Sequence, residues 1–302
     1  MFFSTHNIST DNLDAPLFRN KGIQVSVLRA DKVHPVVSGN KLFKLHYFLA
    51  QALQMPEPTL VTFGGAWSNH LVATAFACKE TGIRCIGMVR GEEPLQPSHT
   101  LQQCKQLGMQ LQFISRQAYS HKSEPAFLAE LTKQWGTHIL VPEGGYHPLG
   151  ARGAAMLLPL AQAAAYTHIA SALGTATTVA GLLLAAPADT TVMGFAALKG
   201  MTDLTNRLSY LLDGAQPAPP FVPILDYCLA GYAKKDARLF AFMNQVWQQF
   251  QLPTDFVYTA KMLYGIYDLA AQDYFAPGSH VLCIHTGGLQ GNSSLPDKTL
   301  TF

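Results

Sequence analysis

The chain has 302 residues, of which 48% are hydrophobic and only 13% are charged, and its formal net charge is +2. This length and composition are typical of a globular protein with one large domain or two modest ones. Because the charge is small and no cluster of lysines and arginines occurs, the composition argues against nucleic acid as a partner and favours a small molecule.

The first residues and the apolar runs bear on the location of the protein. Residues 1–7 lack a basic segment followed by an apolar one, and no apolar run, including 182–186, reaches membrane-spanning length. We therefore expect a cytoplasmic protein without a membrane partner. The cysteines are scattered and odd in number, which predicts reduced thiols and no metal site. They are Cys78, Cys85, Cys104, Cys228 and Cys283.

Short apolar or β-branched runs alternate with longer helical patterns along the chain, which predicts parallel sheets covered by helices, an α/β fold. The expected strands are 60–63, 83–89, 111–114, 138–141, 168–172, 191–195 and 280–284. The expected helices are 41–53, 69–81, 100–107, 125–135, 150–165, 177–185, 237–250 and 261–271. A segment rich in Pro, Ala and Gly, 213–223, is expected to be a connecting loop.

The first candidate for chemistry is Lys41, which follows Gly39 and Asn40 and opens an expected helix. A flexible Gly-Asn turn lets the chain approach a ligand closely, and leucines at helical spacing anchor the segment that carries the amine. This context suits a lysine that forms a Schiff base. A solvated lysine near a helix start, or a lysine that contacts an anion, fits the same residues.

Ligands bind open parallel sheets where strands finish and helices begin, and three such turns are unusual in this chain. In the first, Gly64 and Gly65 allow a tight turn, and Ser68 or Asn69 can cap the following helix and leave N–H groups for a carboxylate or phosphate. The alternative is that Ser68 is a plain N-cap and that Asn69 and His70 are surface polar groups.

The second turn contains small residues and hydroxyls between an apolar strand and an apolar helix. Its backbone N–H groups and threonines can surround a phosphate, although it matches neither common nucleotide motif, and a loop without a ligand is the alternative. The third turn follows the strand expected at 280–284, where Thr286 either meets a ring nitrogen or simply ends the strand. The second turn consists of Gly174, Thr175, Ala176, Thr177 and Thr178.

Together these parts resemble a pyridoxal-phosphate site. The chain is similar, over most of its length, to the family of 1-aminocyclopropane-1-carboxylate deaminases and D-cysteine desulfhydrases, which belongs to the tryptophan-synthase-β-like (fold type II) superfamily. The resemblance implies two open, twisted, mainly parallel sheets flanked by helices, with a smaller domain at 48–147, a larger cofactor-binding domain at 1–47 and 148–302, and a homodimer. The matching stretches are 38–45, 68–70, 141–145, 230–232, 257–261 and 284–288.

The resemblance also implies how the cofactor, pyridoxal 5'-phosphate, is held. Lys41 would bind it covalently and, once released by the substrate amine, would move the proton at the substrate's α-carbon. Asn69 would hydrogen-bond its phenolic oxygen. The second turn, Gly174 to Thr178, would bind its phosphate.

The resemblance implies further roles around an amino-acid substrate. Its carboxylate would lie on Ser68, Asn69 and His70, with the Ser68 hydroxyl available for proton transfer. Tyr258 and Tyr232 match two active-site tyrosines, and either phenol would assist as acid, base or nucleophile. For an isolated tyrosine, a place in the core is the alternative.

Several departures from the family pattern bear on the substrate. Thr259 lies where deaminases that act on the cyclopropane amino acid have a glutamate and where D-cysteine desulfhydrases have a threonine. A neutral hydroxyl, from Thr259 or Thr286, would not stabilise a protonated pyridine ring as a carboxylate does. Trp67 replaces a smaller polar residue, so its indole would contact the substrate and either narrow the pocket or change the substrate, and Ser38 replaces a common glycine.

The expected activity is therefore a pyridoxal-phosphate-dependent α,β-elimination of a small amino acid, with D-cysteine giving pyruvate, ammonia and sulfide. Ring-opening deamination of 1-aminocyclopropane-1-carboxylate is the alternative chemistry, and Thr259 disfavours it. A protein of another class, which binds the cofactor without turnover, would keep Lys41 and the small-residue turn.

Overall fold

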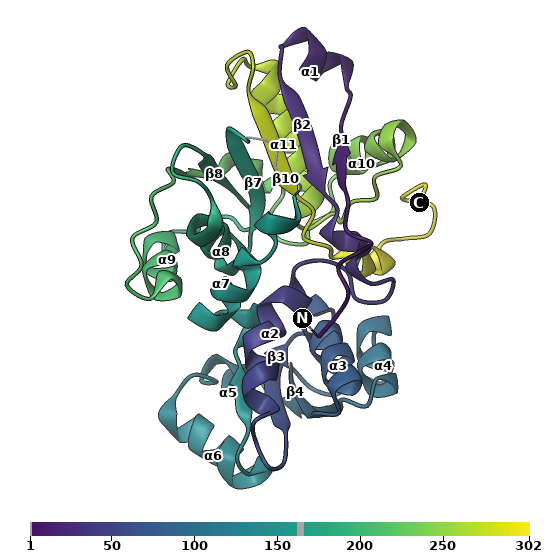
Figure 1. Cartoon of the computed structure of the whole chain (residues 1–302). Coiled ribbons are helices and arrows are strands. Elements are labelled where there is room, and N and C mark those ends of the chain that lie inside the picture. The colour runs from purple at the N-terminus through teal and green to yellow at the C-terminus, as the bar shows by residue number, and fades with distance from the viewer. Residues whose placement is uncertain (1, 162–165) are drawn as a thin grey trace.

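The computed structural model describes residues 2–161 and 166–302 and contains two separate sheets, each flanked by helices (Figure 1). Every strand pair is parallel except the pair formed by the first two strands. In spatial order, the six-stranded sheet contains β1 (Thr10–Asn12), β2 (Gln24–Leu28), β10 (His280–Ile284), β7 (His168–Leu173), β8 (Thr191–Ala196) and β9 (Phe221–Ile224). The four-stranded sheet contains β5 (Gln110–Ile114), β4 (Arg84–Arg90), β3 (Thr59–Gly64) and β6 (Ile139–Val141). The predicted α/β class with two mainly parallel sheets is confirmed.

Helices connect the strands and cover both sheets. The α-helices are α1 (Pro16–Asn20), α2 (Lys41–Ala52), α3 (Asn69–Thr81), α4 (His99–Gln106), α5 (Arg116–Ser120), α6 (Pro125–Trp135), α7 (Pro148–Ala155), α8 (Thr177–Ala185), α9 (Leu204–Leu212), α10 (Ala237–Phe250) and α11 (Thr259–Ala271). Short 3-10 helices are η1 (Ala30–Val33), η2 (Glu143–Gly145), η3 (Leu158–Leu160), η4 (Asp226–Cys228) and η5 (Leu289–Ser294). None of these helices has the length and apolarity needed to cross a bilayer, a statement that covers the described ranges only.

Two predictions of local structure differ from the fold, and both concern segments that contain proline. The helix predicted at 150–165 is wrong in extent, because α7 ends at Ala155 and Pro159 lies in the following 3-10 turn; residues 162–165 of that prediction lie outside the described residues. The loop predicted at 213–223 ends in β9, which includes Pro223. A proline is tolerated there because β9 is an edge strand.

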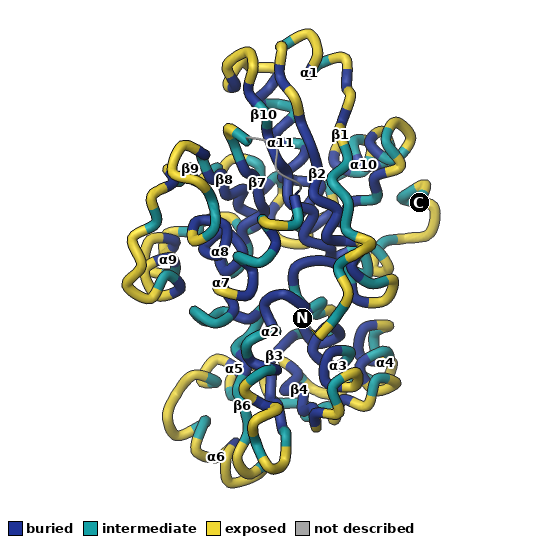
Figure 2. Tube along the Cα trace, viewed as in Figure 1, coloured by how far each residue is buried: buried dark blue, intermediate teal, exposed yellow. Residues whose placement is uncertain are grey.

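The buried residues follow the strands and the helices that face them, as the dark segments in Figure 2 show. Helix α2 packs against both α3 and α7, and its residues Leu42, Leu45 and Leu49 are all buried. The four strands of the smaller sheet all fall within the predicted domain at 48–147. Since α2 contacts helices on both sides of that boundary, the boundary itself stays a prediction. All five cysteines are buried free thiols.

Candidate active site

A cavity lies where the carboxyl ends of β3, β6, β7 and β10 approach the first turn of α2. Because each contributing segment ends a strand or begins a helix, backbone groups without partners in regular structure gather here. Its wall brings together residues that are far apart in the sequence. They include Lys41 and Lys44 from α2, Asn69, the turn Gly174 to Thr178, Tyr258, and Thr286 to Gly288.

Lys41 begins α2, and its amine faces the cavity. Its Nζ donates to Asn40 Oδ1 at 2.8 Å. The preceding Gly39 has a φ of 90°, and a side chain there would overlap the carbonyl oxygen of Thr286, so the turn requires glycine. Burial lowers the pKa of Lys41 to about 8, and the charge of Asp255 only partly opposes this effect. A lysine with this pKa is a stronger nucleophile near neutral pH than an ordinary one.

The second turn predicted from the sequence forms the opposite part of the cavity wall. Ala176, at the N-cap of α8, has a φ of 66° and provides no side-chain cap, so the first N–H groups of α8 are left without a capping side chain. The hydroxyls of Thr175 and Thr177 lie 2.8 Å apart. Thr178 Oγ1 accepts a hydrogen bond from Asn40 Nδ2 at 2.7 Å, which ties this turn to the lysine turn. An uncapped helix start with hydroxyls around it suits a phosphate.

Lys44 is a cavity residue that the sequence analysis missed. It lies one turn after Lys41, on the same face of α2, and is 4% exposed. Burial lowers its pKa well below the usual range, the charge of Lys41 lowers it further, and no carboxylate among the described residues offsets these effects. An anion in the cavity would supply the negative partner that the Lys44 amine lacks. The spacing of three residues from Lys41 was the signal in the sequence.

The first predicted turn divides its polar residues between the cavity and the helix. Asn69 lines the cavity, and its Oδ1 is buried without a hydrogen-bond partner in the described part of the chain. Ser68 is the N-cap of α3, and its Oγ accepts from the N–H of Leu71 at 3.3 Å. Both the functional and the structural alternatives considered for Ser68 therefore stay open, because the hydroxyl caps the helix beside a cavity residue.

His70 points away from the cavity into the smaller sheet. Its Nε2 lies 2.9 Å from Thr62 Oγ1, which itself donates to the carbonyl oxygen of Val141 at 2.8 Å, so Nε2 carries the proton and donates. Burial and the charges of the two cavity lysines lower the pKa of His70 to about 3. The His70 ring is therefore neutral, and His70 is not part of the cavity wall.

Two tyrosines meet beside the cavity. Tyr258 lines it, and its Oη lies 3.1 Å from Oη of Tyr232, which is 49% exposed. Burial and the nearby Tyr232 raise the pKa of Tyr258 well above its usual range. The buried carboxylate of Asp255 holds Tyr258 in place, because it accepts N–H groups of Val257, Tyr258 and Thr259 at 3.0, 2.9 and 2.9 Å. Sequence reasoning missed Asp255, although an Asp just before a helix start is a capping signal.

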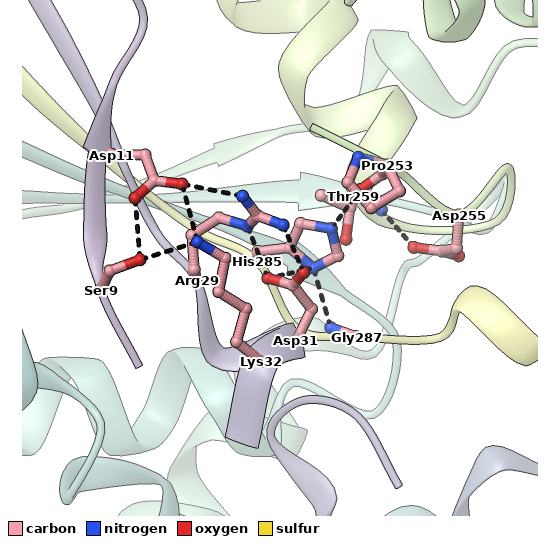
Figure 3. A network of polar contacts seen from close by, with 10 residues as sticks. All are labelled: Ser9, Asp11, Arg29, Asp31, Lys32, Pro253, Asp255, Thr259, His285 and Gly287. Atoms are coloured by element: carbon pink, nitrogen blue, oxygen red, sulfur yellow. Dashed lines mark hydrogen bonds and ion pairs between the residues drawn. The ribbon is translucent and has the colours of Figure 1, made fainter. Parts of the chain in front are cut away.

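A buried polar network supports the loop after β10 (Figure 3). His285 Nε2 donates to the carbonyl oxygen of Pro253 at 2.7 Å, and Nδ1 accepts the N–H of Gly287 at 3.2 Å. Arg29 binds the carboxylate of Asp31 with two nitrogens, at 2.9 and 2.8 Å, and Asp31 lies 3.7 Å from the imidazole. These contacts fix the backbone that carries the cavity residues of this loop.

The structure brings most of the predicted site residues together. On the cavity wall are Lys41, Asn69, Gly174, Thr175, Ala176, Thr177, Thr178, Tyr258 and Thr286. Ser68, His70, Tyr232, Trp67 and Thr259 are not part of that wall. Trp67 is 48% exposed, and the Thr259 hydroxyl is buried without a hydrogen-bond partner among the described residues. The predicted contacts of these two side chains with substrate and cofactor stay predictions.

Comparison with known proteins agrees with this geometry. The sequence profile of the family described as "Pyridoxal-phosphate dependent enzyme" matches residues 7–287. A Pyrococcus horikoshii protein provisionally named 1-aminocyclopropane-1-carboxylate deaminase is 28% identical, over 94% of this chain and 90% of its own length. The D-cysteine desulfhydrase of Serratia proteamaculans is 28% identical, over 88% of this chain and 87% of its own.

A solved structure described as an ACC deaminase homologue is 26% identical to this chain and superposes with a TM-score of 0.81, covering 95% of this chain and 91% of its own. The family match covers most of the sequence and includes both the lysine turn and the small-residue turn. The chain belongs to the family of pyridoxal-phosphate-dependent enzymes, within which it is related to the 1-aminocyclopropane-1-carboxylate deaminases and D-cysteine desulfhydrases.

Proposed function

We propose that this chain binds pyridoxal phosphate in the cavity through Lys41 and eliminates the β-substituent of a small amino acid. The favoured substrate is D-cysteine, which with water gives pyruvate, ammonia and sulfide. One observation carries the proposal. A single cavity contains an amine with a pKa of about 8 and an uncapped helix start with three threonines, which are the partners that an aldehyde and a phosphate require.

The residues of the cavity fit this cofactor, which when bound supplies an electron sink for the bond that breaks at the α-carbon. The free N–H groups at the start of α8 would hold the phosphate, and Lys44 would balance part of its charge. Asn69 lines the cavity, and its amide Nδ2 would orient the ring by donating to the phenolic oxygen. Thr286 lies on the wall at the end of β10 and would contact the ring nitrogen.

Proton movement follows from the environments of Lys41 and Tyr258. The lowered pKa of Lys41 leaves a substantial neutral fraction near pH 8, so its amine accepts the proton from the substrate's α-carbon. Tyr258 stays protonated, because burial raises its pKa, and gives a proton to the leaving sulfur. The Tyr232 hydroxyl, 3.1 Å away, then returns a proton to Tyr258. The substrate carboxylate lies at the first turn of α3, beside Ser68 and Asn69.

The choice of elimination over ring opening rests on Thr259 and on the relatives. The Serratia relative is named a D-cysteine desulfhydrase, and an Arabidopsis thaliana relative, 26% identical over 95% of this chain and 79% of its own length, is named as bifunctional for both reactions. Thr259 supports the first reaction, because a neutral residue lies where the cyclopropane deaminases have a glutamate. Ring-opening deamination is the second candidate. We further propose a cytoplasmic homodimer whose smaller domain is 48–147.

Borohydride trapping tests the attachment to Lys41. Protein freed of cofactor is mixed with pyridoxal phosphate, reduced and mapped by peptide mass spectrometry, and the label is expected on Lys41 and to be absent in Lys41→Ala. Because the neutral amine reacts, the initial rate of attachment should rise with pH and level off above about 8, the pKa of Lys41. A label on Lys44, or no label, would contradict the assignment.

Product analysis tests the reaction. D- and L-amino acids and 1-aminocyclopropane-1-carboxylate are supplied to protein loaded with pyridoxal phosphate, and the amounts of pyruvate and 2-oxobutyrate formed are measured. We expect pyruvate from D-cysteine or β-chloro-D-alanine and little 2-oxobutyrate. Dominant 2-oxobutyrate would select the second candidate. Trapping at Lys41 without turnover of any amino acid would instead favour a protein that only binds the cofactor.

A further inference from the structure

Lys261, on the first turn of α11, is a buried lysine that takes no part in the reaction proposed above. It is only 2% exposed, and its Nζ donates to the carbonyl oxygen of Gly231 at 2.7 Å and of Ala197 at 3.4 Å. Burial lowers its pKa, and no carboxylate in the described residues forms an ion pair with it. Burying an amine is costly unless it is hydrogen-bonded, so the two carbonyl groups are necessary partners of Lys261. The presence of a buried lysine at this position calls for an explanation.

The loop that Lys261 contacts has an unfavourable backbone. Leu229 and Ala233 have φ values of 52° and 51°, which side chains rarely adopt, and Gly231 has a φ of 114°. A non-glycine residue in this region of φ is strained and persists only where other contacts impose it. The Lys261 amine supplies such a contact at the middle residue of the loop, Gly231.

The contact is placed where it determines the position of Tyr232. Gly231 immediately precedes Tyr232, whose hydroxyl lies 3.1 Å from that of Tyr258. Tyr258 is the N-cap residue of α11, three residues before Lys261. The first turn of α11 therefore follows the Tyr258 phenol directly and, through Lys261, holds the backbone beside Tyr232, whose side chain is half exposed.

We propose that Lys261 is a positioning residue that holds Tyr232 in hydrogen-bond contact with Tyr258 at the cavity. The proposal rests on the proposed function to the extent that this phenol pair serves the proton transfers of the reaction. The amine of Lys261 reaches neither the cavity nor the substrate. It acts by fixing the loop that carries Tyr232.

Hydrogen exchange of the cofactor-loaded protein tests the structural step without any substrate. In Lys261→Met the backbone amides of residues 229–233 should exchange roughly tenfold faster or more, because the loss of a hydrogen bond to a charged group releases the loop. Tyr227→Phe is the matched control. It removes a hydrogen bond between the same two segments, Tyr227 Oη to Asp268 Oδ2 at 2.7 Å, and should leave exchange at 231–233 unchanged within about twofold.

A double-mutant cycle tests the functional step. Lys261→Met should lower kcat by about tenfold with KM changed less than about twofold, as expected for an interaction that matters in the transition state. In the Tyr232→Phe background the same substitution should lower kcat little further, because the two residues act in one unit. A purely structural role would instead give additive losses. Lys261→Gln, which keeps one N–H donor, should restore part of kcat and serves in place of Lys261→Met if that variant does not fold.

The outcomes separate this inference from the proposed function. Unchanged exchange at 229–233 in Lys261→Met or Lys261→Gln overturns the inference whether or not any amino acid is turned over. Faster exchange in a protein without turnover leaves Lys261 as the residue that positions Tyr232 and removes only the proposed reaction. Faster exchange with full kcat, or with additive effects in the cycle, also overturns it.

Discussion

Two strand-to-helix turns of this protein look alike in sequence and differ in how their helices begin. The turn from β3 to α3 and the turn from β7 to α8 both follow a buried strand and both contain small and hydroxyl residues. Ser68 caps α3 through its own hydroxyl, which accepts the N–H of Leu71. Ala176, at the same position of α8, has no capping group and adopts a left-handed backbone.

The difference indicates how a helix start becomes an anion site. A capped start has part of its N–H groups satisfied within the chain, whereas an uncapped start that faces a cavity needs an external acceptor. In this protein the uncapped start also faces the two lysine amines of α2, while the capped start contributes mainly Asn69. We therefore expect the phosphate at α8 and the weaker, exchangeable carboxylate of the substrate at α3.

The largest effect is expected from a negative charge at α8. Thr177→Asp places a carboxylate beside the proposed phosphate, and two unit charges about 4 Å apart repel by about 4 kcal/mol at an effective dielectric constant of about 20, or roughly a thousandfold in affinity. The measurement is the dissociation constant of pyridoxal phosphate by absorbance titration.

Thr177→Val is the control for Thr177→Asp, because it has nearly the same shape as threonine and removes only the hydroxyl that contacts Thr175. It should weaken binding by about tenfold, the worth of one hydrogen bond of about 1 kcal/mol or slightly more. Equal affinity in Thr177→Asp and the unchanged protein would remove the phosphate from this turn, provided that thermal unfolding shows both variants to be folded.

Lys44→Met is expected to have a smaller effect: it should raise the stability of the cofactor-free protein and lower its affinity for the cofactor. Removing a buried amine without an anionic partner should stabilise the cofactor-free protein by about 1 kcal/mol, as burial of a polar group costs about that much. The same change should weaken the retention of pyridoxal phosphate by roughly 10- to 100-fold, because a hydrogen bond to a charged group is lost. Chemical denaturation and cofactor titration measure the two quantities.

Lys79→Met, on the exposed side of α3, is the matched control and should change neither quantity. If Lys44→Met destabilised the cofactor-free protein and left cofactor affinity unchanged, Lys44 would be a packing residue and the α8 turn would lack a cationic partner.

The contrast between the turns also marks what the sequence predicts and what it does not. The bounds of α3 and α8 match the predicted helices, since Ser68, Gly82 and the apolar runs are local signals. The sequence also predicts that both turns lie at strand ends near a ligand. It does not predict that Ala176 leaves α8 uncapped, because that backbone conformation depends on surrounding contacts.

Residues that act through distant contacts were missed for the same reason. Lys44 has an ordinary helical spacing, and only the tertiary structure shows that it is buried beside the cavity. Lys261 binds the carbonyl groups of Gly231 and Ala197, so the type of its partners does not mark it in the sequence. Asp255 differs, because it binds N–H groups two to four residues later and its place before a helix start was a local capping signal. The resemblance places His70 at the substrate; its ring hydrogen-bonds to Thr62 of β3 and does not line the cavity, so its role at the substrate stays a prediction.

The smallest effect is expected at the capped turn. Ser68→Ala removes the hydroxyl that caps α3 and should lower the free energy of unfolding by about 1 kcal/mol, the usual cost of a lost N-cap. Pyridoxal phosphate affinity should change less than about threefold, because the phosphate is held at α8 and not at this turn. Denaturation of the cofactor-free protein and absorbance titration measure the two effects.

An added anion can replace the lost cap and so probes the difference between the two helix starts. With Ser68→Ala, the start of α3 is uncapped like that of α8, so millimolar acetate should recover part of the lost stability, whereas it should do little for the unchanged protein.

Ser115→Ala is the control, because Ser115 caps α5 in the same way, accepting the N–H of Ala118 at 3.1 Å, on an exposed helix that does not line the cavity. Acetate should stabilise Ser68→Ala more than Ser115→Ala if the α3 start can take a substrate carboxylate. Equal recovery in both variants would mean that the α3 turn has no particular affinity for carboxylates. A loss of cofactor affinity in Ser68→Ala as large as that in Thr177→Asp would mean that the two helix starts share one anion.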